Sequence, residues 1–156
     1  MTEEQREQVR RALALGDGAE IATAIDAFTH GEQLHQFLAN CNVNDGLLPC
    51  LAIARHPHCD RGTALWLYFQ FADLIGDHES RAEQSANEPE WNADAVMSVL
   101  EERFATSRFG SCELYFDPSE WLGGGEAYRR RLVARGLPEA LLRPVGTRRV
   151  EREWLL

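Results

Sequence analysis

The chain has 156 residues, of which 44% are hydrophobic, and this length and composition are typical of a globular domain rather than a disordered chain. Its formal net charge of −9 argues against a general nucleic-acid-binding protein, which needs positive charge to meet phosphates. All 16 cationic side chains are arginines, and the absence of lysine excludes a Walker-type phosphate site, a Schiff-base lysine and a kinase lysine.

The charge is unevenly distributed along the chain. Residues 1–125 contain 21 acids and 8 arginines, a balance of −13, whereas residues 126–156 contain 4 acids and 8 arginines, a balance of +4. An acidic body suits a protein that attracts a basic partner by electrostatic steering, although the imbalance can equally serve solubility alone. The N-terminal residues are charged, so we expect no secretory signal, no membrane span and a cytoplasmic location.

The first third of the chain predicts short helices separated by turns. Apolar residues recur every three or four positions, and Thr2 and Asp17 are suited to cap the first two helices. Residues 42–46 are rich in asparagine, aspartate and glycine, which bond their own backbone or tolerate positive φ, and therefore predict a turn. The predicted helices cover residues 2–15, 17–30, 32–41 and 47–55.

The segment 60–76 is predicted to be the central helix of the fold. After its first two residues the only charged side chain is Asp73, and a helix that is apolar nearly all round must be buried on most sides. Asp60 is expected to cap the start of this helix and Gly76 to end it. We therefore predict a mainly α fold, in which stacked antiparallel helix pairs surround this buried helix within a single domain over 1–156.

The remaining segments are less regular. The stretch 77–91 has no hydrophobic period and is predicted to be an exposed acidic loop. Helices are predicted over 92–106 and 126–135, with at most a short extended piece near 112–116 between them. The basic tail, residues 147–156, has an apolar end that either docks back onto the body or frays.

Residue types suited to metal binding or catalysis are few. His56, His58 and Cys59 form the only local group of metal ligands, but zinc sites normally contain cysteine pairs two to four residues apart, and buried cysteines more often act as small hydrophobes. Cys59 beside His58 is also the only adjacent pair for nucleophilic catalysis, which requires spatial contact. Asp73, inside an apolar helix, should be hydrogen-bonded to a backbone N–H or an arginine, or else have a raised pKa suited to catalysis. We predict no metal, no cofactor and no enzymatic activity.

The acidic stretch 77–91 is the predicted surface for a protein partner. Its acids are accompanied by a single cation, Arg81, and a neighbouring tryptophan offers an aromatic anchor of the kind that dominates binding energy at interfaces. The alternative is a solvated loop with no binding role. The predicted partner-binding residues are Asp77, Glu79, Glu83, Glu88, Glu90 and Trp91.

A group of motifs lies between Leu34 and Ile75: an Asn-Val-Asn-Asp-Gly turn at 42–46, a proline at 49, and Pro-His-Cys-Asp-Arg-Gly-Thr-Ala-Leu at 57–65. This segment, about a quarter of the chain, resembles a small bacterial family classed as a domain of unknown function. Members of that family carry an Asn-Trp-Asp-Asp-Gly turn, a proline a few residues on, and an Asn-Pro-x-Cys-Asp-x-Gly-Thr-Ala-Leu helix start. The positions that depart from the family pattern are Val43, Asn44 and His56.

The resemblance implies a helical domain with no established catalytic activity. Some similar small acidic bacterial proteins act as immunity proteins beside polymorphic toxins, so the resemblance also implies a link to toxin immunity. The polar residues of the motif are expected to shape the turn and the start of the central helix rather than to perform chemistry. These structural motif residues are Asn44, Asp45, Gly46, Asp60, Gly62, Thr63 and Asp73.

We therefore expect a protein-binding module, and specifically an immunity protein whose acidic face docks on a basic toxin domain, with no nucleic acid and no membrane as partner. The first alternative is an enzyme or small-molecule-binding domain with a site near Asn44, Asp45, His56, His58, Cys59 and Asp73. The second alternative is a helical scaffold or regulatory module. The sequence leaves the oligomeric state and the identity of the toxin open.

Overall fold

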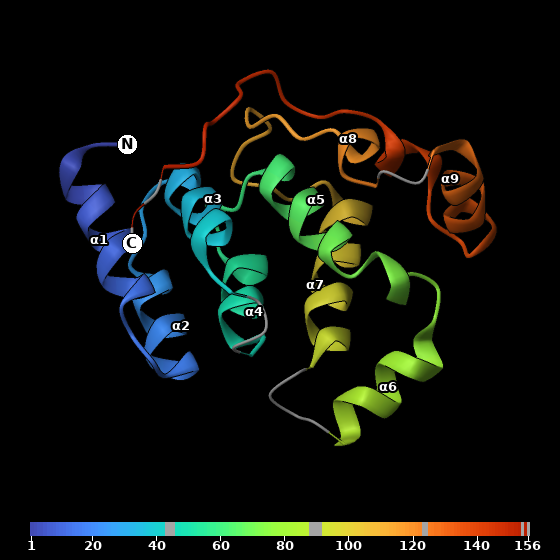
Figure 1. Cartoon of the computed structure of the whole chain (residues 1–156), viewed down its shortest axis with the longest axis horizontal. Coiled ribbons are helices and arrows are strands. Elements are labelled where there is room, and N and C mark those ends of the chain that lie inside the picture. The colour runs from blue at the N-terminus through green and yellow to red at the C-terminus, as the bar shows by residue number, and fades with distance from the viewer. Residues whose placement is uncertain (43–45, 88–91, 123–124, 154, 156) are drawn as a thin grey trace.

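The computed structural model describes residues 1–42, 46–87, 92–122, 125–153 and 155, and these residues form a mainly helical fold (Figure 1). Extended pairing in these ranges is limited to isolated bridges, including Leu114 with Arg148 and Phe116 with Val145, which agrees with the predicted short extended piece near 112–116. The α-helices are α1 (Glu3–Leu13), α2 (Gly18–Asp26), α3 (Gly31–Asn40), α4 (Leu48–Arg55), α5 (Arg61–Gln70), α6 (His78–Asn87), α7 (Ala93–Thr106), α8 (Pro118–Leu122) and α9 (Gly125–Ala134), and two 3₁₀ turns are η2 (Ala72–Leu74) and η4 (Glu139–Leu142).

The helices pack side by side in a row. α1 packs on α3, α2 on α4 and α3 on α5, while α7 contacts both α4 and α5. Figure 1 shows α1 and α2 at one end of the molecule and α6 and α9 toward the other. This packing confirms the predicted mainly α fold of helices stacked around a central helix. Among the described residues, no helix is both long enough and apolar enough to cross a lipid bilayer.

The first helices begin where the sequence indicates. Thr2 and Gln5 form a capping box at α1, and the Asp17 carboxylate accepts hydrogen bonds from the backbone N–H groups of Ala19 and Glu20 at 2.9 and 3.0 Å. These bonds satisfy N–H groups that have no partner within the first turn of a helix. Local side-chain chemistry therefore sets the start of α1 and α2.

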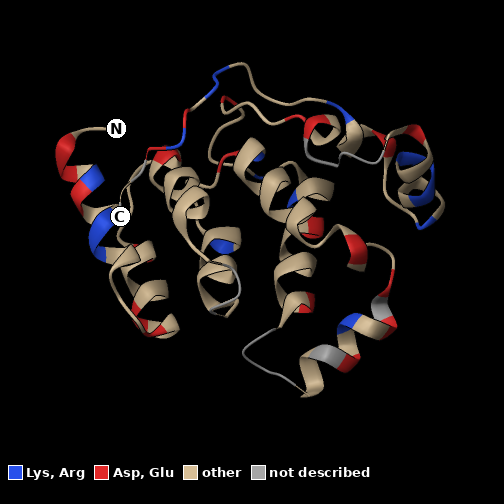
Figure 2. Ribbon diagram, viewed as in Figure 1, with Lys and Arg blue, Asp and Glu red and all other residues tan. Residues whose placement is uncertain are grey.

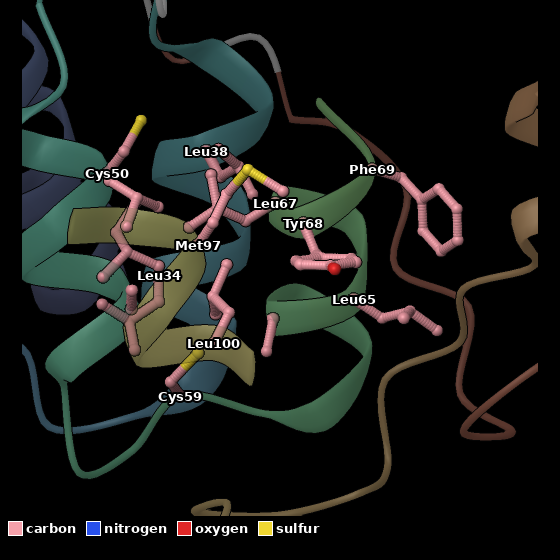
Figure 3. Packing of buried hydrophobic residues seen from close by; sticks show 14 of the residues in the cluster. Leu34, Leu38, Cys50, Cys59, Leu65, Leu67, Tyr68, Phe69, Met97 and Leu100 are labelled. Carbon is pink, nitrogen blue, oxygen red and sulfur yellow. The ribbon is translucent and has the colours of Figure 1, made fainter. Parts of the chain in front are cut away.

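The central helix α5 is buried on opposite sides. Figure 3 shows Leu67 pointing toward Leu38 and Met97, while Phe69 projects the other way. On that second side, the Phe69 ring stacks 6.2 Å from the ring of Phe116. Because both sides are covered, α5 has no amphipathic stripe and its sequence is apolar nearly all round.

The central helix is shorter than predicted. The α-helix ends at Gln70 rather than near Gly76, because Phe71 has φ −106° and ψ 27° and the chain continues as the 3₁₀ turn η2. Gly76 does have a positive φ, 72°, but it lies after η2. Its position allows the carbonyl of Arg135 to approach within 2.0 Å of where a Cβ would lie, so a larger residue does not fit.

The prediction of a loop over 77–91 is wrong for residues 78–87, which form α6. This helix lacks an apolar stripe because it docks through a charged residue. The Arg81 side chain is fully buried and its guanidinium lies 3.1 Å from the carboxylate of Glu101 and 3.7 Å from that of Asp94, both on α7. An ion pair rather than hydrophobic periodicity attaches α6 to the core, and hydrophobic patterning does not detect such a contact.

The C-terminal tail docks back onto the body of the protein. After η4 the chain passes α8 and returns to α3 and α1, where Figure 1 places both chain ends. Arg148 forms a salt bridge of 2.7 Å with Glu32, and the Arg149 guanidinium lies 4.0 Å from the centre of the Tyr115 ring. Of the two outcomes considered for the tail, docking is the one observed over its described residues.

Candidate functional site

Asp60 is the polar centre of the motif region. Its side chain is fully buried, and the Oδ1 atom caps α5 by accepting from the backbone N–H of Gly62 at 2.7 Å. The Oδ2 atom accepts from the Ser111 hydroxyl at 2.5 Å and from the backbone N–H of Glu113 at 2.8 Å. A buried carboxylate requires such donors. Asp60 therefore joins the start of α5 to a segment about 50 residues later in the chain, which is a structural role.

The glycine of the motif permits a close backbone contact. A Cβ atom at Gly62 would lie 2.1 Å from the carbonyl oxygen of Leu114, which is far inside van der Waals contact. Gly146 in the C-terminal segment, with φ 66°, meets the same carbonyl at 2.0 Å. Two glycines thus hold the Leu114 carbonyl between α5 and the tail, and this explains why these positions carry no side chain.

Thr63, the next polar residue of the motif, is also buried and pairs with a histidine. Its hydroxyl lies 3.0 Å from Nδ1 of His35, and the His35 ring packs 5.0 Å from that of Trp66. Burial lowers the pKa of His35 to about 4, so the imidazole is neutral at pH 7. This pair links α3 to α5, and its burial leaves no room for a substrate at the hydroxyl.

Two members of the group His56, His58 and Cys59, which was considered as an alternative site, are buried: His56 and Cys59. Burial lowers the pKa of His56, whose Nδ1 accepts from the backbone N–H of His58 at 3.1 Å. The Cys59 side chain is fully buried, and desolvation raises the pKa of its thiol to about 12. A thiol with these properties is neither accessible nor ionised at neutral pH, so it behaves as a small core residue.

Asp73 lies apart from these residues. The expectation that it sits inside an apolar helix is wrong, because it belongs to the turn η2, is exposed, and accepts from the Tyr128 hydroxyl at 3.1 Å. Cys59 precedes α5 and Asp73 follows it, and a helix of 10 residues is about 15 Å long. Asp73 and Cys59 are therefore at opposite ends of α5. Gly46, which has φ 111°, supports the predicted turn, whereas Asn44 and Asp45 lie outside the described residues.

Polar side chains do gather in a small cleft beside the motif. The cleft has a volume of about 130 Å³ and is lined by His30, Glu32, His58, Ser111 and Arg148, among others. Most of these groups already have partners: His30 Nδ1 accepts from the N–H of Glu32, and the Glu32 carboxylate pairs with Arg148. Within the ranges that the structure describes, no three histidine, cysteine, aspartate or glutamate side chains are grouped as metal ligands.

The acidic surface of α6 differs from the predicted one. Glu79 and Glu83 are exposed, whereas Asp77 accepts from the N–H of Ser80 and faces Arg135 at 3.7 Å. Figure 2 shows acidic positions along α6 and a concentration of arginine on α9. Three further predicted partner-binding residues, Glu88, Glu90 and Trp91, lie outside the described residues.

Sequence reasoning did not identify several residues that organise this region. Ser111 and Glu113 complete the hydrogen bonds of Asp60, and Gln36 and Asn40 of α3 bind the C-terminal segment. Each of these bonds joins residues at least 50 positions apart and uses polar groups that carry no periodic signal.

The comparison with known families gives one match. Residues 29–105, just under half of the chain, match the model of a family described as a domain of unknown function, DUF4274. The matched region contains Asp60, Gly62 and Thr63 but ends before Ser111. No curated protein and no solved structure matches the chain. The match agrees with the resemblance to a family of unknown function and assigns no activity.

Proposed function

We propose that the protein is a binding module of the immunity type, which neutralises a bacterial toxin by docking the outer face of α6 on a basic domain of that toxin. The observation that carries the proposal is the arrangement of charge on α6. Arg81, its only arginine, is turned inward to Asp94 and Glu101, while Glu79 and Glu83 face solvent. The outer face of the helix therefore presents negative charge that no cation on the same helix offsets.

This surface suits association with a basic protein. The net charge of −9 adds a long-range field that favours encounter with a positively charged partner. A toxin that acts on nucleic acid or another anionic substrate has a basic active site, and an acidic helix laid over that site would exclude the substrate. Charge complementarity of this kind acts mainly on the association rate and on partner choice.

The alternative of a catalytic site receives less support from the geometry. The Cys59 thiol is buried with a raised pKa, and Asp73 lies at the other end of α5. Of the polar motif residues that the structure describes, Asp60 caps α5 and Thr63 is buried against His35. The exposed acids of α6 therefore support a binding role better than these buried or separated residues support a catalytic one.

The experiment is co-purification of this protein with the product of the adjacent gene, followed by kinetics of the complex. The Glu79→Lys/Glu83→Lys variant should associate about tenfold more slowly at low salt than the parent protein. A matched control, Glu4→Lys/Glu20→Lys, reverses two exposed acids on α1 and α2 and changes the net charge equally, from −9 to −5. It should stay within about threefold of the parent rate.

The salt dependence provides a second measurement. Association driven by the α6 face should slow as ionic strength rises toward about 1 M, where the screening length falls to about 3 Å. The proposal fails if no neighbouring gene encodes a toxin and no stable complex forms. It also fails if a complex forms but the α6 variant and the control variant associate at the same rate.

A further inference from the structure

The C-terminal segment is bound to α3 through its main chain. Nε2 of Gln36 donates to the carbonyl oxygen of Glu151 at 2.6 Å, and Oε1 of Gln36 accepts from the N–H of Glu153 at 3.0 Å. The Gln36 side chain is fully buried and thus pairs with two main-chain groups two residues apart, as a residue of a neighbouring β-strand does. This contact recognises an extended backbone and does not depend on the sequence of the bound segment.

Asn40, one helical turn after Gln36, continues this ladder but leaves it incomplete. Its Nδ2 donates to the carbonyl oxygen of Glu153 at 2.9 Å, which repeats the first half of the Gln36 pattern. However, Asn40 is only 8% exposed and its Oδ1 has no hydrogen-bond partner among the described residues. A buried acceptor without a donor is uncommon, and a main-chain N–H of a bound segment is a donor of the kind that Oε1 of Gln36 already accepts from.

Side chains of the segment also contact the body of the protein. The Arg6 guanidinium of α1 binds the Glu153 carboxylate with two hydrogen bonds, of 2.7 and 3.3 Å. Leu155 is 6% exposed and belongs to the hydrophobic core, whereas Glu151 and Arg152 are exposed. The surface that holds the tail therefore accommodates an acidic residue, Glu153, and an aliphatic residue two positions later, Leu155.

We propose that the surface formed by Arg6, Gln36 and Asn40 is a binding site for an extended segment of a partner protein, in which an acidic residue precedes a leucine by two positions. The tail of this chain occupies the site in cis. Because the cis segment leaves Oδ1 of Asn40 unpaired, a partner segment that brings a main-chain N–H to this atom gains one hydrogen bond that the tail does not make. Figure 1 shows α1 and α3, which carry these three residues, away from α6, so the proposal is independent of the acidic surface.

The test uses the full-length chain and a fluorescein-labelled peptide with the sequence of residues 150–156, capped at both ends. Fluorescence anisotropy measures the affinity of the peptide for each protein variant. The Glu153→Arg variant places two cations together in cis and weakens the bound tail. It should bind the peptide at least about tenfold more tightly than the parent protein, the factor expected when a competing charge-assisted pair is lost.

Two controls make the result specific. Glu151→Arg makes the same charge change at an exposed carboxylate that forms no salt bridge within the described residues, and it should bind the peptide as the parent does. Adding Arg6→Ala to Glu153→Arg should abolish the gain, while circular dichroism verifies that the helices remain folded. Equal peptide affinity in the Glu153→Arg and Glu151→Arg variants, or no binding by a folded Glu153→Arg variant, would overturn the proposal.

Discussion

Replacement of Asp60 by alanine should reduce the free energy of unfolding by about 3–5 kcal/mol. Loss of a helix cap costs about 1 kcal/mol, and each further buried donor left without an acceptor costs about 1–3 kcal/mol. The donors affected are the N–H groups of Gly62 and Glu113 and the hydroxyl of Ser111. We expect a total near the lower end of the simple sum of these costs, because losses at neighbouring groups are not additive. Such a loss is a large fraction of the usual 5–15 kcal/mol of a folded domain, as a rough guide.

Urea denaturation followed by circular dichroism measures this effect, and Asp17→Ala provides the control. Asp17 caps α2 through two backbone N–H groups, but it is exposed and bonds only local residues. The control should therefore lose only about 1 kcal/mol. The two variants should have the same dependence on urea as the parent and differ only in the midpoint. If Asp60→Ala is no less stable than Asp17→Ala, the long-range bonds of Asp60 contribute nothing and our account of the motif is wrong.

Two other predictions concern titration and thiol chemistry. The pKa of His35 is about 4 in the folded protein and about 6.5 in the unfolded chain. The contribution of neutral His35 to the free energy of unfolding is therefore fully present above pH 6.5. It is lost as the pH drops toward 4, by up to about 3 kcal/mol. In urea titrations, the free energy of unfolding of the His35→Gln variant should fall less steeply with decreasing pH than that of the parent. The same pH dependence in both proteins would contradict a lowered pKa for His35. Under native conditions Ellman's reagent should label the exposed Cys112 well before the buried Cys59, whose thiol reacts only on unfolding. Equal labelling rates in the folded protein would refute the burial of Cys59.

Hydrophobic patterning predicted the parts of the fold that depend on apolar contact. The apolar run after Asp60 marks α5 because both sides of that helix are covered, and the capping residues Thr2 and Asp17 mark the starts of α1 and α2. These signals are local, so a single sequence contains them. The error at the end of α5 arose because Asp73 was counted as part of a continuous helix, although Phe71 had already left the helical conformation.

Contacts made by polar groups over long separations could not be predicted in the same way. α6 was interpreted as a loop because its docking residue, Arg81, is a buried cation rather than an apolar side chain. The ladder from Gln36 to the C-terminal segment joins positions more than 100 residues apart through an uncharged amide. Neither contact leaves a periodic trace in the sequence, because each depends on a single side chain.

The hydrogen bonds of Asp60 also indicate that the region matched by the family is smaller than the region needed for a stable fold. The family match stops at residue 105, yet the carboxylate at its centre is satisfied by Ser111 and Glu113, and Gly62 is fitted to the carbonyl of Leu114. A fragment limited to the matched residues 29–105 would contain the Asp60 carboxylate without two of its three hydrogen-bond donors. A chimaera that joins residues 29–105 to another protein therefore needs a hydroxyl and a backbone N–H from that protein within hydrogen-bond distance of Asp60.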